Sequence, residues 1–296
     1  MSITIQKKQS KARIEKLDNG TISVPTFIKW AGGKTQLLNQ FKSFFPRTFN
    51  KYYEPFIGSG AVFFTIKETF QPIEIILSDI NEELINCYQV VQNQLEELIE
   101  LLKEHRINHN KEYYYSIRNL DANVLSKVEL VARFIYLNKT CFNGLYRVNS
   151  KGKFNVPIGS YKNPQIFKEE NLEKANSLLQ GAELLIMSFE NVLNYASEGD
   201  FVYFDPPYHP LSSTSNFTSY TKNSFSETDQ IRLSEVYAEL DKKGCLLMLS
   251  NSCSEFTLDL YKDYNIQIVN AKRMINSNGK KRGAIPELVV LNYEPE

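Results

Sequence analysis

The stretch Tyr52-Tyr-Glu-Pro-Phe-Ile57, followed directly by Gly58-Ser-Gly60, decides the fold prediction. Its aromatic and aliphatic residues are typical of a buried strand, and the glycines predict a tight turn where that strand ends. Residues 61–70 then have helical character, and Ile73-Glu-Ile-Ile-Leu-Ser78 is a second strand that ends at Asp79. A strand, a glycine turn, a helix and a strand with an acidic end are typical of nucleotide-binding α/β sheets.

Strands and helices continue to alternate through the rest of the chain. We predict strands over residues 183–188, 200–204, 245–251 and 287–293, with a helix over 226–242. Such alternation indicates a wound α/β sheet. The predicted fold class is therefore α/β, with a Rossmann-like mixed sheet of about seven strands.

About a hundred mainly helical residues separate the second predicted strand from the third. Apolar residues recur at helical spacing from position 81 to position 105, which predicts one long amphipathic helix. Further helices are predicted over 126–138 and 164–179, and residues 142–161 are typical of a β-hairpin. We therefore predict a flexible arm over 1–20, one domain made of 21–82 and 183–296, and a second, inserted domain over 83–182.

Composition excludes several classes of protein. Of the 296 residues, 42% are hydrophobic and 23% are charged, which is ordinary for a soluble globular protein. No apolar run approaches the roughly 20 residues of a membrane span, and residues 1–20 lack the apolar core of a signal peptide, so we expect a cytoplasmic protein. The four cysteines show no C-x-x-C spacing, and His105 and His109 are not part of an H-E-x-x-H pattern. We expect reduced thiols and no metal site.

Basic residues are concentrated in two places although the net charge is zero. The segments 139–163 and 272–282 each hold five basic residues and no acidic one. They are either solvated loops or contacts to phosphate groups, and both readings stay open at this point.

Two glycine-rich segments are candidates for cofactor binding. Gly58-Ser-Gly60 lies between a strand and a helix, and Asp79 stands where such sheets place the acid that binds ribose hydroxyls. The segment Ala31-Gly-Gly-Lys-Thr35 resembles the end of a P-loop, but Ile28 occupies the position of that motif's first glycine. We therefore reject an NTPase and retain the glycine turn as a cofactor site.

Asp205-Pro-Pro-Tyr208 follows a predicted strand, at the carboxyl edge where α/β sheets place active sites. The two prolines can also serve only to stiffen a turn after the strand, without a role in catalysis. The exocyclic nitrogen of adenine is a poor nucleophile because its lone pair is delocalised into the ring. A carboxylate and a proline-fixed carbonyl, which only accept hydrogen bonds, can bind its two hydrogens and localise that lone pair. An adjacent aromatic ring can stack on the base, and attack on a sulfonium methyl then needs no metal.

The ordered motifs, from about residue 25 to residue 293, resemble those of the Dam-type DNA adenine methyltransferases. They are Lys29-Trp-Ala-Gly-Gly-Lys34, Glu54-Pro-Phe-Ile-Gly-Ser-Gly60, Ser78-Asp-Ile-Asn81, Phe142-Asn-Gly-Leu-Tyr-Arg-Val-Asn149, Phe154-Asn-Val-Pro157 and Asp205-Pro-Pro-Tyr208. The resemblance implies methylation of the adenine amino group in duplex DNA, typically within GATC, by base flipping. It also implies an S-adenosylmethionine-dependent methyltransferase sheet, with the insertion as the target-recognition domain.

The resemblance also implies roles for single residues. The catalytic turn that holds the flipped adenine would be Asp205, Pro206, Pro207 and Tyr208. S-adenosylmethionine would be bound by Trp30, Lys34, Phe56, Gly58, Gly60, Asp79 and Asp205. Lys29 would contact the first guanine, Arg147 would read the guanine of the opposite strand, and Phe142 would wedge into the base stack. Further contacts to DNA would come from Asn143, Leu145, Pro157 and Tyr161.

Physical chemistry supports the DNA-binding roles independently. Arginine is the best bidentate reader of guanine, and a ring inserted into a base step offsets part of the cost of flipping. Lys151, Lys153 and Lys162 most simply contact phosphates. One departure is Ser160, which stands where several relatives carry an arginine that would contact the DNA backbone.

Two other functions remain as alternatives. Methylation of cytosine N4 needs the same pair of acceptors, although the Asp and the hairpin favour adenine. A non-catalytic DNA-binding regulator is disfavoured by the intact Asp79 and Asp205, and a deaminase by the lack of an H-x-E motif with P-C-x-x-C. The expected partner is duplex DNA, bound by a monomer, with a cognate restriction endonuclease for the same site left open.

Overall fold

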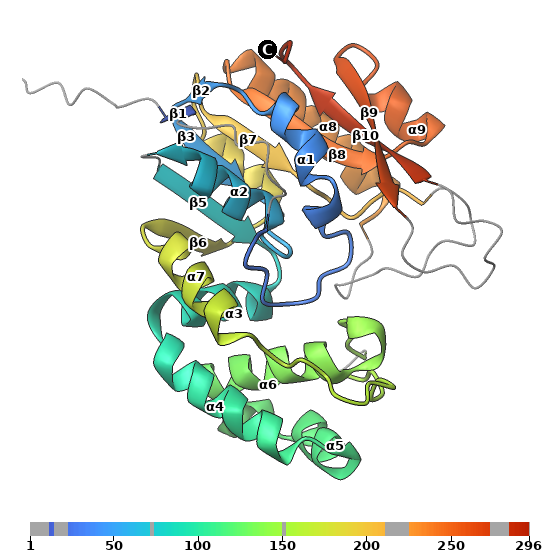
Figure 1. Cartoon of the computed structure of the whole chain (residues 1–296). Helices are drawn as coiled ribbons and strands as arrows, with labels where there is room; N and C mark the ends of the chain where they lie inside the picture. Colours follow the sequence, from blue (N-terminus) through green and yellow to red (C-terminus); the bar gives the residue numbers. More distant parts are fainter. Residues whose placement is uncertain are drawn as a thin grey trace, which may run out of the picture.

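A seven-stranded mixed sheet of order β6-β5-β3-β7-β8-β10-β9 forms the centre of the fold (Figure 1). A computed structural model describes residues 12–14, 23–71, 74–149, 152–210, 225–272 and 284–295. The strands from β6 to β8 are parallel, whereas β10 is antiparallel to both β8 and β9, which confirms the predicted mixed α/β sheet. Their bounds are β3 Lys51–Glu54, β5 Glu74–Asp79, β6 Ala182–Ile186, β7 Phe201–Phe204, β8 Leu246–Ser252, β9 Asn265–Lys272 and β10 Ala284–Leu291.

The direction in which the chain fills the sheet reverses between β3 and β7. From β3 the chain proceeds to β5 and β6 on one side, and β7 and β8 then follow on the other side. Loops that leave the carboxyl ends of two such strands diverge and open a crevice for ligands. The glycine turn follows β3 and the Asp-Pro-Pro-Tyr turn follows β7, so both lie at this switch point.

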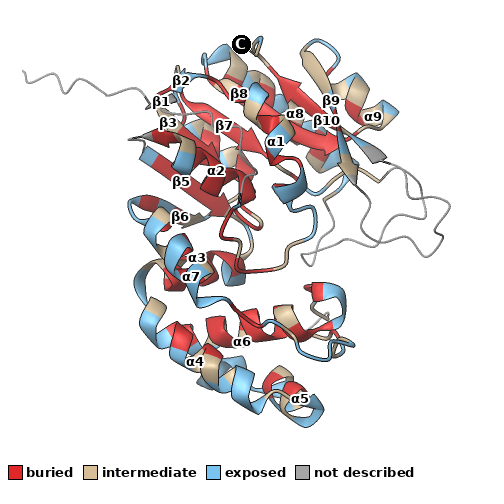
Figure 2. Ribbon diagram, viewed as in Figure 1, coloured by how far each residue is buried: buried red, intermediate tan, exposed pale blue. Residues whose placement is uncertain are grey.

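Strand side chains alternate between the two faces of the sheet and build one core on each face. The central strands of the sheet are mostly buried (Figure 2). Tyr52 and Tyr203 belong to one core, and their neighbours Tyr53 and Phe204 belong to the other. All four side chains are buried, because helices cover both faces of the sheet. The helices that contribute to these two cores outside the insertion are α1 Leu38–Phe41 and α2 Ala61–Thr69 on the first, and α8 Glu227–Lys242 and α9 Glu255–Leu260 on the second.

In the part of the chain that the structure describes, five α-helices lie between β5 and β6 and extend away from the sheet (Figure 1). The prediction of one helix over 81–105 is wrong, because Gln94 leaves the helical conformation with φ −137° and ψ 39°. The break lets α3 contact β5 and β6 while α4 packs on α6, farther from the sheet. The bounds are α3 Glu82–Asn93, α4 Leu95–Asn108, α5 Lys111–Asn119, α6 Lys127–Thr140 and α7 Glu169–Leu179.

The described residues of 142–161, which exclude 150 and 151, fold back on themselves without forming continuous strands. Two isolated antiparallel bridges join Cys141 to Ile158 and Val148 to Phe154. Asn143, with φ 55°, and Pro157, which has no N–H group, interrupt a regular ladder. The predicted hairpin is therefore a looped segment with two bridges.

A small second sheet joins β1 (Ala12–Ile14) antiparallel to β2 (Thr48–Phe49) and β4 (Phe70–Gln71). Three residues of the predicted N-terminal arm thus form a strand, and the other residues of 1–20 lie outside the described part of the chain. Residues 273–282 of the second basic segment also lie outside it. Within the described residues, no helix is long and apolar enough to cross a membrane.

Candidate active site

A cavity of about 490 Å³ opens at the switch point of the sheet. Its walls come from the segment that precedes the short helix η1 (Lys34–Gln36) and from the loops that follow β3, β5, β6 and β7. Predicted cofactor residues and the whole catalytic turn line it together: Trp30, Lys34, Phe56, Gly58, Asp79, Asp205, Pro206, Pro207 and Tyr208. Residues that are far apart in the sequence therefore share one site.

Glycine is required in the turn after β3 by both conformation and space. Gly58 and Gly60 have φ values of 50° and 71°, in the left-handed region that other residues rarely adopt. A Cβ atom on Gly58 would lie 3.0 Å from Trp30 Cδ1, and one on Gly60 would lie 2.7 Å from Tyr88 Oη. Gly60 does not line the cavity; it begins α2 and lets the turn lie against Tyr88, which donates to the Gly58 carbonyl.

A buried ion pair links η1 to the Asp-Pro-Pro-Tyr turn. Lys34 Nζ lies 2.7 Å from Asp205 Oδ1, and the Lys34 side chain is only 4% exposed. The same ammonium group lies 4.6 Å from the ring centroid of Tyr208, a cation–π contact. Tyr208 donates its hydroxyl proton to Glu287 Oε2 at 2.7 Å. Lys34 and Glu287 therefore restrain the carboxylate and the aromatic ring of the catalytic turn.

Burial raises the pKa values of the carboxyl groups at this site. It raises the pKa of Asp205 to about 6, against the opposing effect of Lys34. Burial also raises the pKa of Asp79 to about 6, against hydrogen bonds from the backbone of Asn81, Gly58 and Ile80. Glu54, which accepts a hydrogen bond from Tyr52 at 2.6 Å, has a pKa raised well above its ordinary value, mainly by burial. With pKa values of about 6, Asp79 and Asp205 are therefore mainly ionised at neutral pH, and Glu190 and Asp229 line the cavity as well.

Comparison with protein families identifies the chain. Residues 30–275 match the family described as D12 class N6 adenine-specific DNA methyltransferase. The chain belongs to this D12 class. The D12 methyltransferase assignment confirms the prediction of an adenine-specific enzyme, and it gives no support to a cytosine enzyme or a non-catalytic regulator.

Relatives match the D12 methyltransferase over nearly its whole length. The type II methyltransferase M.MjaIII of Methanocaldococcus jannaschii is 49% identical over 92% of this chain and 100% of the relative. The type II methyltransferase M1.LlaDCHI of Lactococcus lactis subsp. cremoris is 46% identical over 94% of this chain and 98% of the relative. A DNA adenine methylase of Salmonella typhi is 36% identical over 91% of this chain and 95% of the relative.

Histidines of the D12 methyltransferase insertion are engaged with tyrosines. His105 Nδ1 lies 2.7 Å from the Tyr113 hydroxyl, and His109 Nδ1 lies 2.8 Å from the Tyr136 hydroxyl. Across the described residues, no group of three or more His, Cys, Asp or Glu side chains is arranged to hold a metal ion.

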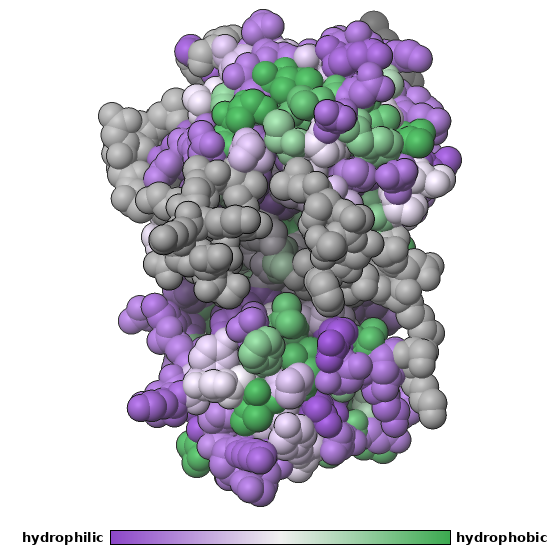
Figure 3. Space-filling view, turned by 90° about the vertical axis from the view of Figure 1, so that its right-hand side faces the viewer, coloured by the Kyte–Doolittle hydropathy of each residue, from purple (hydrophilic) through white to green (hydrophobic). Residues whose placement is uncertain are grey.

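Apart from Lys29, the residues predicted to contact DNA lie in the segment 142–161. Figure 3 faces the side of the molecule on which this segment lies, and the lower, helical part there carries hydrophobic residues among hydrophilic ones. Phe142 is 48% exposed, and Leu145 and Tyr161 are exposed as well. Asn143, Arg147, Lys153 and Pro157 are also exposed, whereas Lys151 lies outside the described residues. Exposed rings and aliphatic chains among polar groups suit contact with bases more than burial in a core.

Lys29 and Arg147 are both held in place by neighbouring side chains of the insertion. Lys29 Nζ donates to the Tyr161 hydroxyl at 3.1 Å and lies 4.3 Å from that ring's centroid. Its side chain crosses Gly144, where a Cβ atom would overlap it. Arg147 Nε donates to Asn155 Oδ1 at 2.7 Å, which leaves the two terminal nitrogens of the guanidinium for another partner.

Asn138 and Tyr146 connect this segment to the cavity, and the sequence did not identify either. Asn138 is buried; its Oδ1 accepts from Lys29 N at 2.7 Å, and its Nδ2 donates to Lys29 O at 2.7 Å and to Gly144 O at 3.4 Å. Tyr146 stacks on Trp30, with ring centroids 5.9 Å apart, and donates to Glu83 of α3. An asparagine in the last turn of a helix does not indicate a hydrogen bond to a residue 109 positions away in the sequence.

Replacing Asn138 with alanine should lower the free energy of unfolding by about 1–3 kcal/mol, because buried partners lose their hydrogen bonds. It should also weaken discrimination between DNA sequences, since Lys29 and Gly144 lose their common anchor. Urea denaturation and methylation of matched and mismatched duplexes would measure the two effects.

Asn176→Ala is the matched control for this change. Asn176 Nδ2 donates to the carbonyls of Val91 and Gln92, at the sheet end of the insertion. The control should reduce stability similarly and leave sequence discrimination unchanged. Equal discrimination by both variants would contradict a recognition role for Asn138.

Proposed function

We propose that this D12 methyltransferase transfers a methyl group from S-adenosylmethionine to the amino group of an adenine flipped out of duplex DNA, within GATC. The observation that carries the proposal is the acceptor-only turn at the cavity wall. Asp205 is ionised at neutral pH, and Pro206 and Pro207 have no N–H group that would oppose an incoming amine. The Pro207 carbonyl already accepts from Gln230 at 2.9 Å, and we assign the Pro206 carbonyl as the acceptor for the base.

The cavity suits S-adenosylmethionine in size, charge and shape. Its volume of about 490 Å³ lies within the range of small-molecule sites. Asp79, at the end of β5, would accept from the ribose hydroxyls, and Trp30, Lys34, Phe56 and Gly58 would hold the amino acid part. Gly58 has no Cβ, so the backbone and the Trp30 ring can both approach the ligand. When bound, the cofactor supplies an electrophilic methyl group on a sulfonium centre.

The residues of the catalytic turn would make the adenine nitrogen nucleophilic. Asp205 would accept one amino hydrogen and the Pro206 carbonyl the other, which favours the pyramidal amine that forms during transfer. Tyr208 would stack on the adenine ring, and its hydroxyl bond to Glu287 fixes the plane of the ring. Lys34 keeps Asp205 charged, because its ammonium group lowers the pKa of that carboxyl.

The insertion, residues 83–182, would recognise DNA. Phe142 would enter the gap left by the flipped base and offset part of the unstacking cost. Arg147 and Lys29 would read guanines, and Asn143, Leu145, Pro157 and Tyr161 would contact neighbouring bases or sugars. Lys153 would contact a phosphate, which positions the duplex without specifying sequence.

The enzyme would act as a cytoplasmic monomer, and its partner would be a restriction endonuclease that cuts the same site. Support for that partner comes from two relatives of 49% and 46% identity, which are named type II methyltransferases. Proteins named DNA adenine methylase match at lower identity, 36%.

Methyl transfer from radiolabelled S-adenosylmethionine to a panel of duplexes would test the function and its target. One duplex contains GATC and the others differ by one base pair each. We expect label only in the GATC duplex, as N6-methyladenine after hydrolysis. Label in another adenine-containing duplex would refute GATC, and label in N4-methylcytosine would refute the assigned base.

Cofactor affinity should decrease as the pH falls below about 6, where Asp79 and Asp205 take up protons in the free enzyme. Lys34→Met should move the midpoint attributed to Asp205 to higher pH, because Lys34 lowers that pKa. Calorimetric titration with S-adenosylmethionine across this range would measure both. Lys51→Met is the control, since Lys51 pairs with Glu74 at 2.6 Å and lies away from the cavity. An affinity independent of pH would contradict the assigned carboxylates.

A further inference from the structure

We propose that Gln230 and Asn251 form a positioning relay that sets the geometry of the Asp-Pro-Pro-Tyr turn for methyl transfer. The inference rests on the proposed function, because it assumes that Asp205 and the Pro206 carbonyl accept the adenine amino group. Neither residue belongs to a motif of the sequence analysis. Gln230 comes from α8 and Asn251 from β8, two elements of the core on one face of the sheet.

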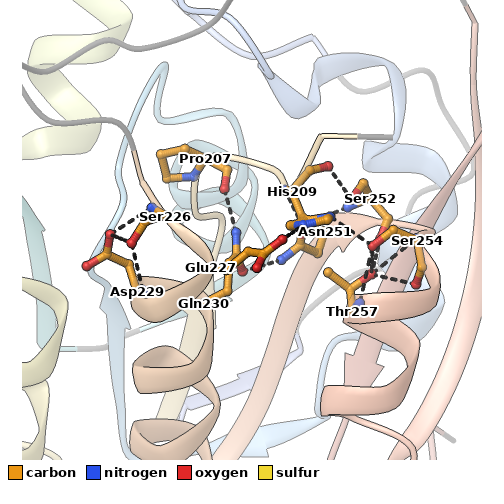
Figure 4. A network of polar contacts seen from close by, with 10 residues as sticks. All are labelled: Pro207, His209, Ser226, Glu227, Asp229, Gln230, Asn251, Ser252, Ser254 and Thr257. Carbon is orange, nitrogen blue, oxygen red and sulfur yellow. Dashed lines mark hydrogen bonds and ion pairs between the residues drawn. The ribbon is translucent and has the colours of Figure 1, made fainter. Parts of the chain in front are cut away.

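The relay is a chain of buried hydrogen bonds (Figure 4). Gln230 Nε2 donates to the Pro207 carbonyl at 2.9 Å, and Asn251 Nδ2 donates to Gln230 Oε1 at 2.9 Å. Asn251 Oδ1 accepts from the backbone N–H groups of His209 and Ser252, at 3.2 and 2.8 Å. Gln230 is 1% exposed and Asn251 is 0% exposed, so water does not compete for these bonds.

The direction of the relay is fixed by its two ends. Backbone N–H groups can only donate, so the oxygen of Asn251 must face His209 and Ser252, and its NH₂ group must face Gln230. The oxygen of Gln230 then faces Asn251, and its NH₂ group faces the Pro207 carbonyl. Neither side chain amide can rotate by 180° without placing two donors or two acceptors together.

The relay fixes the position of the backbone immediately after Asp205 and the Pro206 carbonyl. Ser252 Oγ donates to the His209 carbonyl at 2.7 Å, so three backbone atoms between 207 and 209 are fixed. On the other side, Phe204 is fixed by its pairing with Leu249 of β8. Asp205 and Pro206 lie between these two fixed positions. The orientation of the Pro206 carbonyl therefore depends on the hydrogen bond from Gln230 to the Pro207 carbonyl. A small misplacement of reacting groups is enough to slow catalysis strongly.

Gln230→Met removes the relay with little change in side-chain volume. We expect kcat to fall about 10–100-fold while the Kd for S-adenosylmethionine stays within about twofold, because Trp30, Lys34 and Asp79 are untouched. Steady-state rates are divided by the concentration of cofactor-binding sites from calorimetry, so unfolded protein does not contribute to kcat. A duplex with 2-aminopurine at the target position reports by fluorescence whether the base still leaves the helix.

Gln92→Met is the matched control, because Gln92 Nε2 also donates to backbone carbonyls, of Leu179 and Ala182, but far from the cavity. Its kcat should equal that of the wild type. Unchanged kcat in Gln230→Met would overturn the relay, and so would a fall in kcat matched by an equal loss of cofactor affinity. Asp205→Ala is assayed beside them: if it remains active, the proposed function fails; if it is inactive while Gln230→Met is normal, only the relay fails.

Discussion

Asp205→Ala should lower kcat by about 10²–10³-fold, because it would remove one of the two acceptors proposed to stabilise the developing charge on the adenine amine. The carboxylate lies 2.7 Å from Lys34 and lines the cavity, so the truncation also leaves a buried ammonium group without its partner. Binding to DNA should change little, since the segment 142–161 is not altered. Initial rates of tritium transfer and a gel-shift titration with a GATC duplex would measure the two quantities.

Asp241→Ala provides the comparison for this variant. Asp241 also accepts a short hydrogen bond, from Asn292 Nδ2 at 2.7 Å, but it lies at the end of α8 and away from the cavity. Its kcat per folded molecule should be normal. If Asp205→Ala retained a wild-type rate, Asp205 would have no part in activating the amine.

Arg147→Ala should reduce discrimination against the wrong base pair at one guanine by about 1–3 kcal/mol, or roughly 5–150-fold in kcat/KM. Arg147 is exposed, and the bond from its Nε to Asn155 Oδ1 leaves both terminal nitrogens free of that contact, in the fork that guanine requires. The measurement is kcat/KM on GATC and on duplexes changed at each position. Discrimination should be lost at one position and kept at the others.

Lys153→Ala serves as the contrast, because a phosphate contact carries no sequence information. It should weaken binding to all duplexes alike and reduce the slope of log Kd against log salt by about one unit. If Arg147→Ala weakened binding to all duplexes equally, Arg147 would instead be assigned a phosphate contact.

Local patterns predicted most of the sheet because each strand carries its own signal. The run before Gly58 and the apolar run Ile75–Leu77 each identify a buried strand without reference to the rest of the chain. The break at Gln94 was missed because the apolar spacing continues through it, and only packing of α3 on the sheet and of α4 on α6 shows why it bends. Strand β9 is not among the predicted strands, although Ile266 and Ile268 alternate with polar residues there. It lies at the edge of the sheet, beside β10.

Motifs placed the cavity residues, but not the residues that support them. Asp79 and Asp205 end strands, so their meeting follows from the topology of a parallel sheet. Glu287 and Gln230 bond the Asp-Pro-Pro-Tyr turn from distant positions, and Asn251 bonds Gln230 and the following residue His209. A lone Glu, Gln or Asn within a strand or helix has no recognisable pattern. Glu54 lies inside a quoted motif, but its burial beside Tyr52 is a property of the packed core.

The break at Gln94 has a consequence for how such enzymes can diversify. Helix α3 is bonded to the sheet through Gln89 Nε2 to Leu184 O, and α7 is bonded to α3 through Asn176 Nδ2 to Val91 O. The portion between Gln94 and Lys168, which runs from α4 through the segment 142–161, is therefore the natural unit to exchange between two such enzymes. If the insertion recognises the target as proposed, a chimera built at these boundaries should take the donor's target preference and keep the recipient's chemistry, provided that position 29 matches the incoming Asn138 and Gly144.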